Sequence, residues 1–138
     1  MKSKLPRGWR NLWFFRVVSK NSLKNIAAKG LMPNYIIEPD PEISGHFNNL
    51  KQGLDFVKKY GDKVLFFTQT PDQAWNYARP QQNVTIRFPL PPNLDPNSIY
   101  EDMTGYFGVL KIPPEEIEVH VRGNWKTGIW RPLKRRKK

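Results

Sequence analysis

Residues with hydroxyl and aromatic side chains gather in the segment 63–78, which reads KVLFFTQTPDQAWNYA. Two of its rings, Phe66 and Tyr77, could hold a flat ligand ring between them. Thr68 and Thr70 would place hydroxyl groups beside those rings. The segment therefore predicts a ligand site, and the alternative is an ordinary β-α unit whose aromatic residues belong to the core.

A single cation, Arg16, interrupts the apolar run at residues 12–18. Burying a charge requires a partner, so Arg16 is expected either at a strand end or paired with an anion. That anion is one of the chain's 12 acidic residues or a ligand phosphate, which a guanidinium binds through two hydrogen bonds. If Arg16 binds a ligand phosphate, the ligand expected together with the 63–78 segment is a dinucleotide. One of its rings would stack on Phe66 and Tyr77, and its phosphates or ribose would contact Arg16.

Other reactive groups are sparse. The chain has no cysteine and two histidines, so neither a disulfide, a cysteine nucleophile nor a metal site is expected. No P-loop, GxGxxG, HExxH or GxSxG motif occurs. Acidic pairs stand at Glu101-Asp102 and at Glu115-Glu116, and adjacent like charges usually belong to solvated loops.

These residues must be positioned by a predicted α+β fold. Val64–Phe67 reads as a buried strand, and Thr70 caps a helix that begins at Pro71 and continues through Ala78. The other predicted elements follow the apolar periodicity. Strands are expected at 12–18, 84–90, 106–112 and 117–121, helices at 23–29 and 48–60, and an acidic proline-rich loop at 33–46. The order is not a strict βαβ alternation, which favours mixed, mostly antiparallel sheets with a few helices.

The positive charge is concentrated at the two ends of the chain. The chain of 138 residues carries a formal net charge of +11, but residues 1–24 and 122–138 contain no acid. Clustered cations favour a polyanionic partner, with nucleic acid the first candidate, whereas the alternatives are a solubilising tail or a targeting signal. The cations expected to bind phosphates are Lys2, Lys4, Arg7, Arg10, Lys126, Arg131, Lys134, Arg135, Arg136, Lys137 and Lys138.

The length predicts a single domain at residues 1–121, followed by a basic tail at 122–138 without periodicity. Trp125 and Trp130 lie in that tail, where they would pack it onto the domain or stack on bases. No apolar run is long enough to span a membrane, and no signal peptide is recognisable. A cytoplasmic protein is therefore expected, and a secreted effector is the alternative.

Two segments of the chain resemble the ADP-ribosyltransferase superfamily, in its poly-ADP-ribose-polymerase-like and toxin-like branches. They are Leu12-Trp13 through Gly30-Leu31-Met32-Pro33 and then Val64–Ala78, and the resemblance extends over about residues 12–121. It implies a split β-sandwich that binds NAD, with Arg16 on the ribose and with Phe66 and Tyr77 flanking nicotinamide. It also implies that Thr68 and Thr70 support the pocket.

The chain departs from this family at the catalytic glutamate, whose expected position falls on Tyr106. A phenol can donate a hydrogen bond but supplies no full negative charge. Glu101 or Asp102 would then have to reach the site from the preceding loop. The resemblance thus implies an NAD-dependent ADP-ribosyltransferase acting on nucleic acid or a nucleic-acid-associated protein, with Arg16, Glu101 and Tyr106 as catalytic residues. One alternative is a non-catalytic nucleic-acid-binding or assembly protein. The other is a phosphotransferase on RNA ends, which would need more basic site residues than Arg16 and Arg87 offer.

Overall fold

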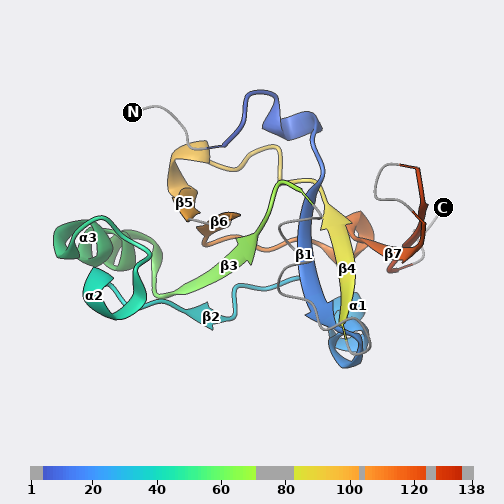
Figure 1. Cartoon of the computed structure of the whole chain (residues 1–138), viewed down its shortest axis with the longest axis horizontal. Helices are drawn as coiled ribbons and strands as arrows, with labels where there is room; N and C mark the ends of the chain where they lie inside the picture. Colours follow the sequence, from blue (N-terminus) through green and yellow to red (C-terminus); the bar gives the residue numbers. More distant parts are fainter. Residues whose placement is uncertain (1–4, 71–82, 103–104, 124–126, 135–138) are drawn as a thin grey trace.

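The computed structural model describes residues 5–70, 83–102, 105–123 and 127–134. Within these ranges the chain has an α+β fold that contains two four-stranded antiparallel sheets (Figure 1). The first sheet has the order β1-β4-β7-β8. Its strands are β1 (Phe14–Ser19), β4 (Asn83–Phe88), β7 (Glu118–Arg122) and β8 (Ile129–Pro132).

The second sheet has the order β2-β3-β6-β5. Its strands are β2 (Tyr35–Ile36), β3 (Lys63–Phe67), β6 (Gly105–Gly108) and β5 (Tyr100–Asp102). Strand β5 pairs with β6 so that Tyr100 opposes Phe107 and Glu101 opposes Tyr106. Glu101 therefore sits on an edge strand of the second sheet, whereas the sequence predicts a loop before residue 106.

The two sheets meet where β1 passes the end of β3. Phe15 and Thr68 form an isolated antiparallel bridge, with both N–H···O distances at 2.8 Å. Figure 1 shows β1 and β3 close together at this point and diverging toward the start of β3. We call this place the β1–β3 junction.

Three α-helices lie outside the sheets. Helix α1 (Leu23–Lys29) follows β1 and ends at Gly30, whose φ of 84° suits a residue without a side chain. Helix α3 (Leu50–Tyr60) is capped by Asn49, whose side chain accepts a hydrogen bond from the Gln52 N–H. The short helix α2 (Pro41–Ser44) is capped by Asp40, whose side chain accepts a hydrogen bond from the Glu42 N–H. The described residues also form four 3-10 turns: η1 (Trp9–Asn11), η2 (Lys20–Ser22), η3 (Pro96–Ser98) and η4 (Pro114–Glu116).

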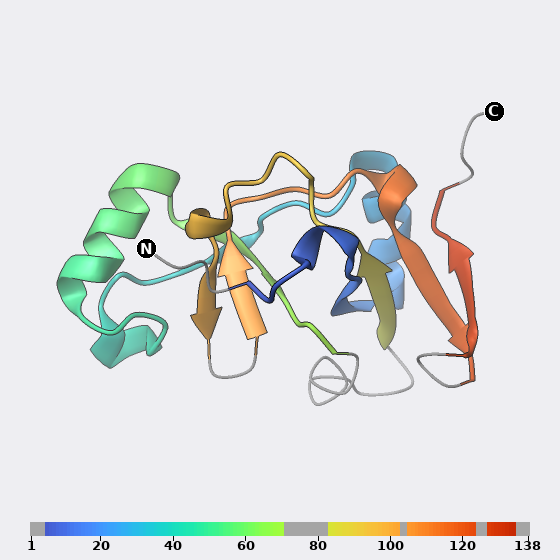
Figure 2. The same cartoon turned by 90° about the horizontal axis from the view of Figure 1, so that it is seen from above.

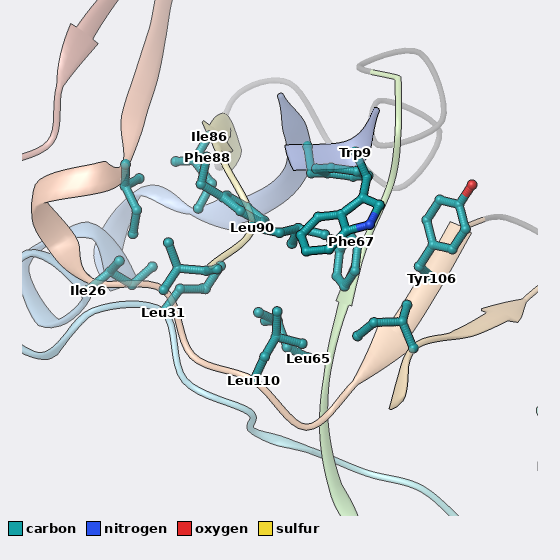
Figure 3. Packing of buried hydrophobic residues seen from close by; sticks show 14 of the residues in the cluster. Trp9, Ile26, Leu31, Leu65, Phe67, Ile86, Phe88, Leu90, Tyr106 and Leu110 are labelled. Atoms are coloured by element: carbon teal, nitrogen blue, oxygen red, sulfur yellow. The ribbon is translucent and has the colours of Figure 1, made fainter. Parts of the chain in front are cut away.

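The first core cluster joins the two sheets (Figure 3). Leu65 and Phe67 of β3 enter it from the second sheet, and Phe14 of β1 enters it from the first. The ring of Phe14 meets the ring of Phe67 edge-on, with centroids 5.4 Å apart. The other buried members are Leu5, Trp9, Ile26, Leu31, Ile86, Phe88, Leu90, Ile99, Tyr106, Leu110, Ile112, Ile117 and Val119.

The second core cluster lies on the opposite face of the second sheet, beneath α3. Its buried members are Ile37, Phe47, Phe56, Val64 and Phe107. Because side chains alternate along a strand, β3 supplies Leu65 and Phe67 to the first cluster and Val64 and Phe66 to the second. Viewed from above, α3 stands at one end of the molecule and β8 at the other (Figure 2).

Most predicted elements are confirmed, and four short ones were missed. The segment predicted as a loop at 33–46 contains β2 and α2. Strand β5 was not predicted, and the residues assigned to an aperiodic tail include β8, which pairs with β7. The predicted helix from Pro71 to Ala78 lies outside the described residues. No helix in the described part of the chain is long and apolar enough to cross a membrane.

Candidate functional site

Arg16 occupies the interior of β1, not its end. It opposes Ile86 of β4, and alternation places it on the same face as Phe14 and Val18, which contact the first core cluster. Its Nη1 donates a 2.7 Å hydrogen bond to the backbone oxygen of Phe66 on β3. The side chain therefore spans the two strands beside the β1–β3 junction.

The described residues around Arg16 leave its charge uncompensated. Burial lowers the pKa of the guanidinium. No carboxylate of the described residues forms an ion pair with Arg16. The sequence left open an ion pair between Arg16 and an acidic residue of the chain, and the described residues contain no such pair. A guanidinium has five N–H donors, and only one is committed to Phe66 within this part of the chain. Arg16 can thus accept an anionic partner.

The Phe66 ring does not share the Arg16 face. It packs edge-on against Tyr35, with ring centroids 4.9 Å apart, and lies 5.2 Å from His46 and 5.4 Å from Phe107. The structure therefore brings the Phe66 backbone, but not the centre of its ring, to Arg16. Tyr77, the second predicted ring, lies outside the described residues.

Thr68 holds the β1–β3 junction together. Its buried Oγ1 lies 3.3 Å from the Phe15 carbonyl oxygen and 2.9 Å from the Thr70 carbonyl oxygen. These contacts satisfy the hydroxyl with backbone acceptors, so Thr68 supports the site by fixing backbone geometry. Thr70 is exposed immediately after this contact.

Tyr106 reaches the same side of the second sheet as Arg16. Its ring stacks on Phe67 at 5.7 Å and meets Phe14 edge-on at 6.3 Å. The hydroxyl points away from the cluster and lies 3.5 Å from Gln69 Oε1, a long hydrogen bond (Figure 3). Burial, and secondly the charge of Glu101, raise the pKa of the Tyr106 phenol.

Glu101 lies directly across from Tyr106 and is exposed. The row Phe67, Tyr106, Glu101 runs over one face of the second sheet, from the core to solvent. The structure therefore places the two predicted catalytic residues of β5 and β6 side by side. For Asp102 it describes the backbone within β5.

The predicted phosphate-binding cations fall at different places. Arg10 lies over the Trp9 ring at 4.3 Å and donates to the Pro92 carbonyl, while Arg7 is exposed nearby. Arg131 is exposed on β8, and Lys134 pairs with Glu115 at 3.5 Å. The described residues thus include Arg7, Arg10, Arg131 and Lys134; Lys2, Lys4, Lys126, Arg135, Arg136, Lys137 and Lys138 lie outside them.

The sequence reasoning missed an aromatic-cationic stack on the outer face of the first sheet. The Arg87 guanidinium carbon lies 4.3 Å from the centre of the Trp13 ring and 4.4 Å from that of Trp130. Its Nε donates to Glu118 Oε1 at 2.8 Å. Alternation puts Trp13 and Phe15 on one side of their segment and separates Arg87 from Ile86 and Phe88. The register of β1 against β4, which opposes Phe15 to Arg87, brings the two groups to one face and had no signal in the sequence. Trp130 therefore packs its strand onto the domain.

Comparisons of the chain with protein-family models, with characterised proteins and with solved structures found no match.

Proposed function

We propose that the protein binds NAD at the β1–β3 junction and transfers its ADP-ribose to nucleic acid or to a nucleic-acid-associated protein. The observation that carries the proposal is Arg16. It is a half-buried cation on β1 that lacks a carboxylate partner among the described residues and spans two diverging strands. A partly desolvated guanidinium of this kind favours an anionic ligand, because the ligand replaces the hydration that burial removed.

The arrangement of the two antiparallel sheets supports the same proposal. They meet at one bridge, between Phe15 and Thr68, and then separate. This resembles the split β-sandwich that the residue patterns in 12–33 and 64–78 suggest. In such a fold the pyrophosphate or ribose of NAD would meet Arg16, and Thr68 would keep the two strands in register.

The reaction breaks the bond between the nicotinamide nitrogen and the ribose carbon, and the departing nicotinamide keeps the electron pair. An acceptor nucleophile forms the new bond to that carbon and loses a proton to solvent. Positive charge develops on the ribose in between, so a nearby carboxylate accelerates the step. Glu101 is our candidate for that carboxylate, and Tyr106 would donate a hydrogen bond to a ribose hydroxyl.

We do not assign Phe66 to nicotinamide stacking, because its ring contacts Tyr35, His46 and Phe107. Its backbone oxygen instead orients Arg16. Tyr77 keeps the stacking role that the family resemblance implies.

The test combines binding with turnover. NAD should raise the melting temperature of the wild-type protein, since a ligand that binds only the native state stabilises it. Radiolabelled NAD should label RNA, DNA or proteins of a cell lysate. Arg16→Ala should abolish both effects. Glu101→Gln should keep the thermal shift while slowing transfer roughly 100-fold.

Lys29→Ala is the matched control, because it removes an exposed cation at the end of α1, away from the junction. It should behave as wild type in both assays. Absence of a thermal shift at millimolar NAD, or labelling that survives Arg16→Ala, would refute the proposal.

A second function is favoured by one specific observation: Tyr106 stands where the family resemblance expects the catalytic carboxylate. The protein would then bind nucleic acid through its basic ends without catalysis. NAD-independent, salt-sensitive binding together with no label transfer would identify this alternative.

A further inference from the structure

The outer face of the first sheet carries a row of aromatic and cationic side chains that the proposed NAD site does not use. From β1 to β8 it presents Trp13, Phe15, Arg87, His120 and Trp130. Ring contacts connect them: Phe15 to Trp130 at 6.0 Å and His120 to Trp130 at 5.0 Å. We call this surface the Trp13 face.

The rings of the Trp13 face are held in place before any partner arrives. Arg87 lies between the two indoles, and its position is fixed by Glu118. Trp13 is nevertheless 38% exposed, although it is a large apolar residue. A fixed and exposed ring offers a stacking surface that loses little conformational entropy on binding.

The charge around the Trp13 face is positive. Strands β1 and β8 are its two edges, roughly 14 Å apart across three strand spacings. The acid-free segments 1–24 and 122–138 contain these edge strands. Among the described residues of the face the acidic side chain is Glu118, and it pairs with Arg87. Arg131 is exposed on the edge strand β8, on the side opposite Trp130.

We propose that the Trp13 face binds single-stranded nucleic acid. A base stacks on the exposed side of Trp13, and cations of the two acid-free segments contact the phosphates. An exposed ring beside edge strands without acidic residues fits this partner, because stacking requires unpaired bases and the backbone supplies the anions. A duplex keeps its bases stacked on one another and gains only the electrostatic part.

The experiment measures the affinity of the full chain for fluorescein-labelled 15-mers of dT, of U and of a mixed-sequence duplex, without NAD. Both single strands should bind more tightly than the duplex, and the dT and U arms show whether DNA or RNA is preferred. Trp13→Ala should weaken single-strand binding roughly ten-fold or more, whereas Trp13→Phe should restore most of the loss. The affinity should fall as the salt concentration rises, because the backbone phosphates supply part of it.

Tyr35→Ala is the matched control, since Tyr35 is an exposed aromatic residue of the second sheet. It should leave the affinity unchanged, and so should Arg16→Ala, which separates this inference from the NAD proposal. The melting temperature of each variant verifies that it is folded. If Trp13→Ala does not fold, the affinity of Trp13→Phe is compared with that of the wild type instead. Equal affinity of wild type and Trp13→Ala, a duplex bound as tightly as the single strands, or no binding at low salt would overturn the inference.

Discussion

At the scale of single residues, Arg16 combines a cost in stability with a possible gain in binding. Desolvation of its charge opposes folding, and its one hydrogen bond in the described residues does not neutralise that charge. Replacing buried charged groups by apolar side chains of similar size is often neutral or stabilising.

We therefore expect Arg16→Met to leave the free energy of unfolding unchanged or to raise it by about 1 kcal/mol. Urea unfolding of the ligand-free protein measures this change. The same variant should lose the NAD-dependent thermal shift. A loss of more than about 2 kcal/mol would instead identify Arg16 as a structural residue.

Tyr106 provides a prediction about pH. Its pKa is raised in the folded protein, first by burial and then by Glu101, so the folded state holds the phenol proton more tightly than the unfolded state. The resulting stabilisation is complete below pH 10 and is lost as the pH rises through the folded-state pKa. Wild type should therefore lose stability more steeply above pH 10 than Tyr106→Phe.

Glu101→Gln tests the smaller cause separately. It removes the carboxylate opposite Tyr106, so one tyrosine should ionise at a lower pH when tyrosinate absorption is followed by ultraviolet spectroscopy. The pKa of Tyr100 is also raised by burial, and Tyr100 remains in all of these proteins, so differences between variants isolate Tyr106. Identical titration curves would argue against a charge on Glu101 close to the phenol.

At the scale of elements, α3 contains a glycine that helix propensity alone would misjudge. A Cβ at Gly53 would lie 2.0 Å from the Pro39 carbonyl oxygen and 2.7 Å from the Pro39 carbonyl carbon. Backbone atoms cannot rotate away from such a contact. The glycine therefore lets the segment before α2 cross closely over the helix.

Gly53→Ala should therefore destabilise the protein by roughly 1–3 kcal/mol, although alanine normally stabilises a helix interior by about 1 kcal/mol relative to glycine. Thermal unfolding measures the change. Lys51→Ala, at an exposed position of the same helix, should have an effect smaller than about 0.5 kcal/mol. A stabilised Gly53→Ala protein would mean that Pro39 does not pack on α3.

The elements that the sequence predicted are those with a strong local signal. The apolar runs of β1 and β3, the alternation of β4 and β7, and the capped, periodic α3 were all recognisable. Strands β2, β5 and β8 have two to four residues each, which is too short for a recognisable alternation of apolar and polar side chains. Strand β2 also depends on a distant partner, since Tyr35 opposes Val64, whereas β5 and β8 pair with the neighbouring strands β6 and β7. These strands were therefore missed.

The candidate site was predictable only in part, for a related reason. The position of Arg16 within an apolar strand suggested a cation in need of a partner. In the structure Arg16 lies on β1, and its hydrogen-bond partner is the Phe66 backbone oxygen on β3. The side chains of β3 alternate between two core clusters, and the Phe66 ring packs against the second one. Its backbone oxygen is therefore left to contact Arg16. Which side of β3 faces which cluster is decided only when both sheets are assembled.

At the scale of the whole molecule, the second sheet separates two cores that share its strands. β3 supplies Leu65 and Phe67 to one cluster and Val64 to the other, while β6 supplies Tyr106 to the first and Phe107 to the second. If the second sheet comes apart in one core, the side chains that the same strands supply to the other core are exposed as well. We therefore expect a single cooperative unfolding transition.

Two probes test this expectation from opposite ends of the molecule. Near-ultraviolet ellipticity reports the packing of aromatic residues, among them Trp9, Trp13 and Trp130 at the first sheet, and far-ultraviolet ellipticity reports helices including α3. Their melting curves should coincide. Leu65→Ala and Val64→Ala, which point into different clusters, should each lower both curves together, by roughly 2–5 and 1–3 kcal/mol of stability respectively. Separate transitions, or a Val64→Ala protein that shifts only the helical signal, would mean that the α3 end unfolds on its own and that β3 does not couple the cores.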